Sequence, residues 1–246
     1  MSASRLIGLI AGTGILLALG LFLYASSWHP RDRGYPIQGI DVSHHQGAID
    51  WKRIKRQGVD FAYIKATEGA DHRDRLFAAN LKASAAAGIP RGAYHFFTLC
   101  RSGAEQAANF IAAVPRNRRL LPPVVDLEFG GNCAARPGRD ALLKELNAFL
   151  ARVEAHAGRH AILYLTREFE AAYAVSAAID RPLWLRSLVT APAYGARPWT
   201  LWQASNFRRL RGISGRVDWN VVAADCDFLA RREACSGPRD RRRSPA

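Results

Sequence analysis

The chain has 246 residues and a formal net charge of +14, because 35 Lys and Arg residues stand against 21 Asp and Glu residues. This length suits a single α/β domain. With 49% apolar and 23% charged residues the composition is globular, which excludes a wholly disordered or fibrous chain. Four Cys residues are too few to replace a hydrophobic core, so a small disulfide-rich scaffold is also excluded. The basic charge permits a polyanionic partner such as nucleic acid, a membrane surface or an acidic cell wall, but selects none of them.

An apolar run without charged residues occupies residues 6–24, directly after Arg5. It approaches the ~20 residues that a helix needs to cross the hydrocarbon core, and it exceeds the roughly 7–15 residues of a usual signal-peptide core. We therefore predict a cytoplasmic segment at residues 1–5 and a single-pass signal-anchor helix at residues 6–24. A cleaved signal peptide is the alternative, because Ala25-Ser26-Ser27 suits a cleavage site. Both versions place the rest of the chain outside the cytoplasm, in the cell envelope or secreted.

Strand and helix patterns alternate along the rest of the chain. Residues 25–36 are predicted as a polar linker, residues 37–230 as the folded domain and residues 231–246 as an Arg-rich, disordered tail. Several strand segments are apolar on consecutive residues, as parallel strands covered on both faces tend to be. The strand ranges are 38–42, 59–66, 92–97, 124–129, 161–165, 183–185, 200–203 and 217–222, and the helix ranges are 49–57, 76–87, 104–114 and 137–157. This order predicts an α/β fold, namely a closed parallel TIM-like (β/α) barrel with fewer than eight helices, and an open doubly wound sheet is the alternative.

Two carboxylates stand at the end of the apolar segment 124–129. Asp126 and Glu128 are separated by one residue, so the alternation of a strand points both to the same face. Mutual repulsion and partial burial raise the pKa of one of them, and a protonated carboxyl group beside an ionised one is what glycosidic cleavage requires. Asp41 ends the first strand segment and Asp218 lies in the last one. Because the strand ends of a barrel meet in one pocket, the sequence predicts four carboxylates there.

A metal site is the rival interpretation of these acids, with Asp41, His44, His45 and Glu128 as ligands. No His-Glu-x-x-His or Cys-pair motif supports it, so we predict no metal. A capping or loop role is the alternative for the two His residues.

Aromatic side chains near the predicted strand ends could pack against sugar rings, although core packing is the commoner role; they are Tyr63, Tyr94, Phe96, Tyr164, Trp184 and Trp202.

Six segments, in order within residues 37–229, resemble glycoside hydrolase family 25, the lysozymes or N-acetylmuramidases. They read GIDVSHHQGAIDW (39–51), FAYIKATEG (61–69), AGIPRGAYHFF (87–97), PPVVDLEF (122–129), LWQAS (201–205) and GISGRVDWN (212–220). The resemblance implies a modified (β/α) barrel that hydrolyses the β-1,4 bond between N-acetylmuramic acid and N-acetylglucosamine in peptidoglycan. It implies no metal or organic cofactor.

The resemblance also assigns roles to residues of this chain. Glu128 would be the general acid, and Asp126 would orient the substrate N-acetyl group or act as the partner carboxylate. Asp41 and Asp218 would line the floor of the pocket. The residues that would help to bind sugar are Tyr63, Lys65, Glu68, Tyr94 and Gln203, and the strand-end aromatics add Tyr164 and Trp184.

Two positions depart from the family pattern. Ala204 stands where an aromatic residue usually follows Trp-Gln, and Arg186 lies in a segment that more often reads Leu-Trp-Ile-Ala. We expect a reshaped sugar subsite in which Arg186 contacts a lactyl or stem-peptide carboxylate.

Three alternatives to a muramidase are weighed against these residues. A wall-binding protein without turnover would keep the pocket, but the four intact carboxylates argue against lost catalysis. A nucleic-acid binder would use the basic body and tail but would not explain inward carboxylates, so no nucleic-acid partner is expected. A chitinase-type hydrolase would carry a multi-Asp signature that is absent around Asp126.

Four cysteines allow three disulfide pairings. Cys100 and Cys133 follow neighbouring strand segments on the same face of the predicted barrel, and Cys226 and Cys235 are close in sequence. We therefore predict the disulfides Cys100–Cys133 and Cys226–Cys235 in an oxidising compartment.

Overall fold

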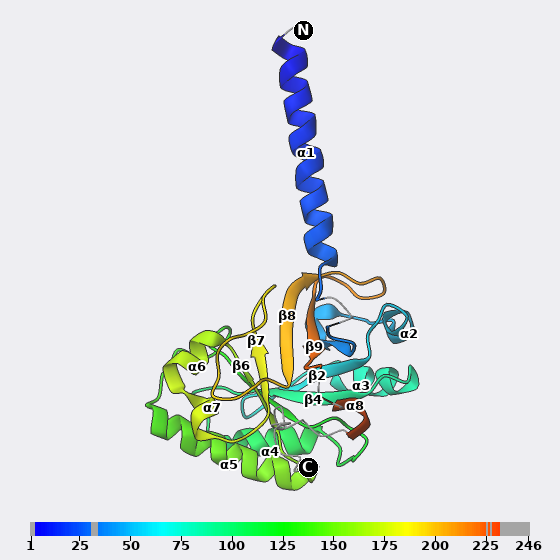
Figure 1. Cartoon of the computed structure of the whole chain (residues 1–246). Helices are drawn as coiled ribbons and strands as arrows, with labels where there is room; N and C mark the ends of the chain where they lie inside the picture. Colours follow the sequence, from blue (N-terminus) through cyan, green and yellow to red (C-terminus); the bar gives the residue numbers. More distant parts are fainter. Residues whose placement is uncertain (1–2, 31–33, 225, 227, 232–246) are drawn as a thin grey trace, which may run out of the picture.

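The computed structural model describes residues 3–30, 34–224, 226 and 228–231, and leaves out the side chains of residues 3–11, 25–26 and 230–231. Helix α1 (Ala3–Ser27) projects away from the body of the protein (Figure 1). Its large apolar side chains between Ile15 and Tyr24 are 50–70% exposed. Within the described part of the chain, no helix combines the length and the apolar character needed to cross a membrane. The predicted tail beyond Arg231 lies outside the described residues.

Eight strands close into a barrel (Figure 1). Their order around the ring is β1-β9-β8-β7-β6-β5-β4-β2, and pairing of β1 with β2 closes it. The strands are β1 (Gln38–Val42), β2 (Phe61–Glu68), β4 (Arg91–Phe96), β5 (Val124–Leu127), β6 (Ile162–Leu165), β7 (Leu183–Arg186), β8 (Leu201–Arg208) and β9 (Val217–Val222). A two-residue strand, β3 (His72–Arg73), pairs with the end of β2 outside the ring. The predicted closed barrel is confirmed, and the open sheet is not what forms.

Strand β9 departs from the predicted all-parallel order. It runs antiparallel to both of its neighbours, β8 and β1, whereas β1 and β2 pair in parallel, as do β7 and β8. Only residues 209–216 connect β8 to β9, and parallel pairing would need a crossover of a dozen or more residues. The resulting register places Asp41 directly opposite Asp218.

Seven α-helices follow α1 in the described part of the chain, which agrees with the predicted number of fewer than eight. They are α2 (Trp51–Lys55), α3 (Phe77–Ala86), α4 (Gly103–Ala113), α5 (Arg139–Ala157), α6 (Arg167–Tyr173), α7 (Val175–Ala178) and α8 (Phe228–Arg231). Asp50 caps α2, because its side chain accepts a hydrogen bond from the Arg53 backbone N–H. Helices α6, α7 and α8, each of seven residues or fewer, were not predicted from the sequence.

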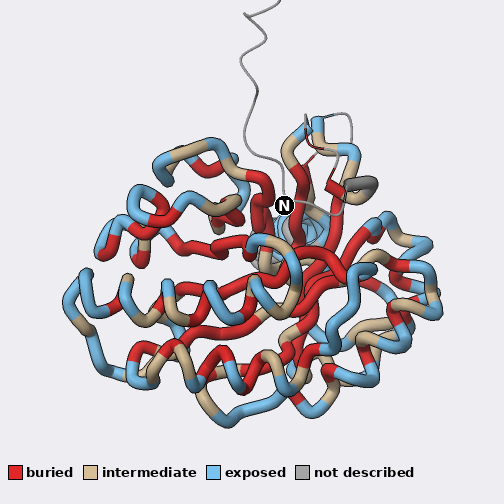
Figure 2. Tube along the Cα trace, turned by 90° about the horizontal axis from the view of Figure 1, so that it is seen from below, coloured by how far each residue is buried: buried red, intermediate tan, exposed pale blue. Residues whose placement is uncertain are grey.

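Apolar side chains fill two separate spaces, one between the ring and its helices and one inside the ring. The outer core contains Phe110 of α4, Phe149 of α5 and Ile40 of β1, all at most 1% exposed. The inner core contains Phe61, Tyr63 and Trp184 and lies below the strand ends that carry the acids. Figure 2 shows the buried strands at the centre and the exposed turns at the periphery. Since each fully buried large side chain contributes roughly 1.5–3 kcal/mol, the two cores hold the strand ends in place.

The predicted disulfide Cys100–Cys133 is wrong for this structure, in which both residues are free thiols. The barrel does bring the two thiols together. A hydrogen bond between them is the largest cause of the raised pKa of the Cys100 thiol. Loop proximity was thus predicted correctly, but proximity alone does not oxidise two thiols. The other predicted pair, Cys226–Cys235, includes Cys235, which lies outside the described residues.

Gly103, the first residue of α4, is required by close packing of α4 on α5. A Cβ atom added to Gly103 would lie 1.8 Å from the Glu145 carbonyl oxygen. We predict that Gly103→Ala lowers the free energy of unfolding by about 1–3 kcal/mol, because the two helices must move apart. Gly138→Ala, where an added Cβ meets nothing within 4 Å, should cost less than Gly103→Ala in the same urea titration. Equal losses in the two variants would contradict this account.

Candidate active site

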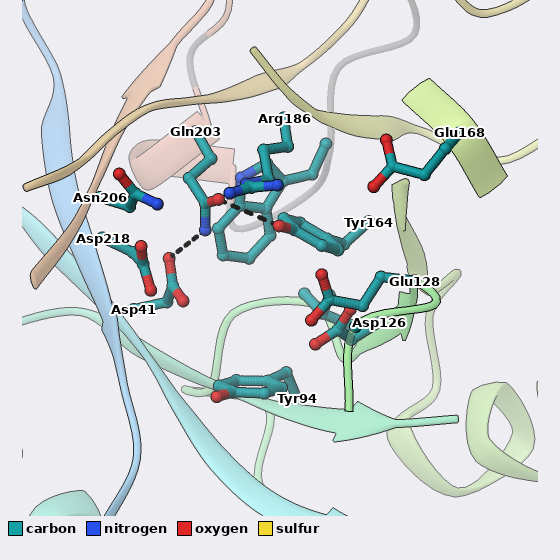
Figure 3. Close-up of a pocket in the computed structure, with 13 residues that line it drawn as sticks. Asp41, Tyr94, Asp126, Glu128, Tyr164, Glu168, Arg186, Gln203, Asn206 and Asp218 are labelled. Atoms are coloured by element: carbon teal, nitrogen blue, oxygen red, sulfur yellow. Dashed lines mark hydrogen bonds between the residues drawn. The ribbon is translucent and has the colours of Figure 1, made fainter. Parts of the chain in front are cut away.

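The ring brings the four predicted acids to one end of the barrel. Asp41 lies in β1, Asp126 in β5 and Asp218 in β9, while Glu128 follows directly after β5. Figure 3 shows Asp126 and Glu128 on one side of a pocket, with Asp41 and Asp218 facing them from the other. Residues that are 177 positions apart in the sequence therefore share one cavity because the barrel closes between β1 and β9.

The pocket is half of a longer groove. A cavity of about 380 Å³ adjoins a second one of about 320 Å³, and each is within the usual size range of a ligand site. Both are lined by the four acids, Tyr94 and Gly130. We call one half the Arg186 end, which adds Tyr164, Glu168, Arg186, Gln203 and Asn206. The other half, the Lys65 end, adds His45, Gln46, Lys65, Glu68 and Phe96.

Asp41 is held by two side-chain amides, one on the neighbouring strand β9 and one on β8, the next strand in the ring. Its Oδ2 accepts hydrogen bonds from Asn220 Nδ2 at 2.7 Å and from Gln203 Nε2 at 3.2 Å. Gln203 Oε1 in turn accepts a hydrogen bond from the Tyr164 hydroxyl at 3.0 Å. Burial, and then the nearby charge of Asp218, raise the pKa of the Asp41 carboxyl well above its usual value. Asp41 is therefore a fixed and buried wall of the groove.

Asp126 and Glu128 form the opposite wall. Burial is the largest cause that raises the pKa of Asp126, followed by the charge of Glu128. Asp126 Oδ1 is inaccessible to solvent and has no hydrogen-bond partner among the described residues. Burial also raises the pKa of Glu128 to about 6, and the charge of Arg186 opposes this rise. Near neutral pH the pair can thus hold and release a proton, which suits an acid catalyst.

The comparisons with known proteins agree with this geometry. The sequence profile of the glycosyl hydrolases family 25 matches residues 40–213. Lysozyme M1 of Streptomyces globisporus is 38% identical over 197 residues, which cover 75% of this chain and 67% of that protein. The chain belongs to glycosyl hydrolase family 25.

Solved structures show the same relationship for this family 25 glycosyl hydrolase. A family 25 glycosyl hydrolase from Bacillus anthracis superposes with a TM-score of 0.73 at 35% identity, covering 84% of this chain and 97% of the other. A lysozyme from Streptomyces coelicolor gives a TM-score of 0.71 at 36% identity, covering 78% and 94%.

Most of the sugar-binding residues expected for the family 25 hydrolase do line its groove, but Tyr63 does not. Tyr63 is fully buried in the inner core, and its hydroxyl donates a hydrogen bond to the Pro122 carbonyl at 3.1 Å. The prediction that Tyr63 binds substrate is therefore wrong, because its ring packs in the inner core and its hydroxyl is hydrogen-bonded to the backbone. Trp184 lines the groove with a 2% exposed ring, whose Nε1 donates to Asn220 at 3.0 Å.

Lys65 and Glu68 occupy the Lys65 end as an ion pair. Lys65 Nζ donates to Glu68 Oε2 at 2.6 Å and lies 5.0 Å from the centre of the Phe96 ring. The pair offers sugar hydroxyls both a donor and an acceptor while its net charge is zero.

The two His residues that suggested a metal have other surroundings. His44 Nδ1 lies 2.9 Å from the Asp74 carboxylate, so His44 contributes to a loop contact, whereas His45 lines the groove. Among the described residues, no three His, Cys, Asp or Glu side chains are arranged to hold a metal ion.

Asn220, Glu168 and Asn206 were not assigned to the site from the sequence. Asn220 positions Asp41, Glu168 follows β6 on α6, and Asn206 lies in the part of β8 that extends beyond the predicted strand. Glu168 stands near the carboxyl end of a predicted strand, as the four acids do, and that position could have identified it. Asn206 offers no such pattern.

The raised pKa of Glu128 predicts a stability effect with a definite sign. Because the pKa rises from 4.5 to about 6, ionisation of Glu128 destabilises the native state as pH increases through this interval. The free energy of unfolding of Glu128→Gln should therefore be about 1–2 kcal/mol higher than that of the wild type at pH 8 and equal to it near pH 4. Urea unfolding at both pH values measures the difference. An advantage of the variant that is as large at pH 4 as at pH 8 would show that packing, rather than charge, is its cause.

Proposed function

We propose that this glycoside hydrolase cleaves the β-1,4 bond between N-acetylmuramic acid and N-acetylglucosamine in peptidoglycan. The observation that carries the proposal is Glu128, an acid with a pKa near 6 that lies beside Asp126 in an open groove. The relatives named as lysozymes support the choice of substrate.

Glu128 is proposed as the general acid. It donates its proton to the glycosidic oxygen as the bond to the sugar C1 breaks, and the leaving group departs as an alcohol. The positive charge that develops at C1 meets a wall of carboxylates, including Asp41 and Asp218. Water then adds to C1 and loses a proton to an ionised carboxylate of the site, which completes the hydrolysis and returns the proton that Glu128 gave up.

Asp126 is proposed to orient the sugar. Its buried Oδ1 has no hydrogen-bond partner among the described residues, and an unsatisfied buried acceptor favours a ligand that brings a donor. The N–H of a substrate N-acetyl group is such a donor. Lys65, Glu68, Tyr94, Tyr164, Trp184 and Gln203 are proposed to bind the sugar rings and hydroxyls along the groove.

A binding protein without turnover is the weaker candidate. Binding alone gives no reason to bury several carboxyl groups together, because their repulsion disfavours the native state. Catalysis does give one, since it uses the shifted pKa values.

We predict that the wild-type protein releases fragments from purified peptidoglycan that carry N-acetylmuramic acid at the new reducing end. Glu128→Gln keeps the shape of the side chain but cannot donate a proton, so turnover should fall by at least ~10²-fold. Mass spectrometry identifies the reducing ends, and a reducing-sugar assay gives the rate.

The control for this experiment is binding of Glu128→Gln to intact cell walls, which should persist. Activity of a folded Glu128→Gln sample within a few-fold of the wild type would show that another residue is the acid. Reducing ends on N-acetylglucosamine would contradict the proposed bond.

We also propose that residues 6–24 direct the hydrolase to the cell envelope and retain it there as a single-pass anchor. Support comes from the uncharged apolar sequence and from the exposed apolar side chains of α1, since such a surface favours an apolar environment. Peptidoglycan lies outside the cytoplasm, which agrees with an exported domain.

We predict that the full-length protein fractionates with membranes, resists extraction by high salt and is released by detergent. Amino-terminal sequencing of the recovered protein should find the intact start of the chain. A soluble form that begins near Ser27 or Trp28 would contradict retention and would leave the enzymatic proposal unchanged.

A further inference from the structure

Arg186 is the last residue of β7, and its backbone is firmly placed. Its carbonyl oxygen accepts a hydrogen bond from the Tyr194 hydroxyl at 2.8 Å, and it pairs in register with Gln203 of β8. Its side chain is half-buried and extends into the groove above the acids (Figure 3). The sheet therefore fixes the backbone of Arg186, whereas its guanidinium faces the open cavity.

The guanidinium of Arg186 has no protein partner in the described part of the chain, where it forms neither a hydrogen bond nor an ion pair. The other Lys or Arg that lines the groove, Lys65, is already paired with Glu68 at 2.6 Å. The two ends of the groove thus differ in charge. At the Lys65 end Glu68 neutralises the charge of Lys65, whereas at the Arg186 end the guanidinium has no ion-pair partner among the described residues.

We propose that Arg186 binds a carboxylate of the muramyl branch of the substrate and selects glycan strands that carry one beside the bond to be cut. This proposal rests on the proposed function. A guanidinium presents a planar fork of donors that matches a carboxylate in a bidentate way, which a neutral sugar hydroxyl cannot do. The muramyl branch has two sources of this group, namely the lactyl carboxylate of strands without peptide and the carboxylates of a stem peptide.

Occupation of Arg186 has a consequence for the acid catalyst. In the free protein the charge of Arg186 lowers the pKa of both Glu128 and Asp218. A bound carboxylate compensates this charge, so Glu128 keeps its proton to a higher pH in the complex. The other charged or titratable groups that line the groove with Glu128 are Asp41, His45, Lys65, Glu68, Tyr94, Asp126, Tyr164, Glu168 and Asp218. Since they are present whether or not Arg186 is occupied, a variant at position 186 isolates its effect.

The test compares soluble glycan fragments in four forms. Amidase-treated fragments carry free lactyl carboxylates, and peptide-bearing fragments carry only stem-peptide carboxylates. Each is also converted to the uncharged amide with a carbodiimide and ammonia. The kcat and KM values are measured for the wild type, Arg186→Gln, Arg186→Lys and Arg152→Gln. Arg152 is an exposed residue of α5 that does not line the groove, so it controls for the loss of one positive charge.

We expect the wild type to prefer at least one free carboxylate form over its amide in kcat/KM. Arg186→Gln should reduce this preference by about 10- to 100-fold, the range for a hydrogen bond between charged groups. Arg186→Lys should retain part of the preference, and Arg152→Gln should match the wild type. Loss of preference on amidase-treated fragments identifies the lactyl group, and loss only on peptide-bearing fragments identifies the stem peptide.

The pH dependence of kcat supplies a second readout. For the wild type, the pH at which kcat declines on the alkaline side should be higher with the carboxylate form than with its amide, and Arg186→Gln should abolish this difference. Equal preferences in the wild type and Arg186→Gln would overturn the role of Arg186 while leaving the proposed function intact. Failure of the wild type to cleave any of the four forms would overturn the proposed function and this inference with it.

Discussion

The burial of four carboxyl groups together at one end of the barrel is the constraint on which the site depends. Burial disfavours ionisation of Asp41, Asp126, Glu128 and Asp218 and is the largest cause of their raised pKa values. The charge of neighbouring carboxylates adds to the rise for Asp41, Asp126 and Glu128. Two amide hydrogen bonds donated to Asp41 offset part of this cost. The same shifted pKa values give the site an acid that is still partly protonated near neutral pH.

The barrel maintains this unfavourable arrangement because its stability comes from elsewhere. The inner core below the acids and the outer core under the helices bury large apolar side chains from most of the strands. Antiparallel β9 then inserts between β8 and β1 and brings Asp218 opposite Asp41. A parallel crossover at this point would have required a longer connection, so the short β8–β9 loop is what completes the group of acids.

The two ends of the groove show how one cavity can treat its ligand asymmetrically. At the Lys65 end, an ion pair and the Phe96 ring offer polar and apolar contacts without net charge. At the Arg186 end, a cation without a protein partner among the described residues lies near the acids. The proposed contact of Arg186 with a carboxyl branch would give a polymer of alternating sugars, of which only one bears that branch, a preferred direction in this groove.

The sequence by itself determined the alternation of strands and helices, the closed barrel and the identity of the four acids. The segments and the Asp-x-Glu pair are local features that can be read within a few residues, whereas the barrel was predicted from the repeated order of strands and helices along the domain. Only the tertiary structure decided that Tyr63 belongs to the inner core, that β9 is antiparallel and that Asn220 and Glu168 belong to the site. It also showed Cys100 and Cys133 as neighbouring free thiols. The reason is physical: burial, pKa shifts and the pairing of charges depend on side chains from strands far apart in the sequence, which meet only when the ring closes.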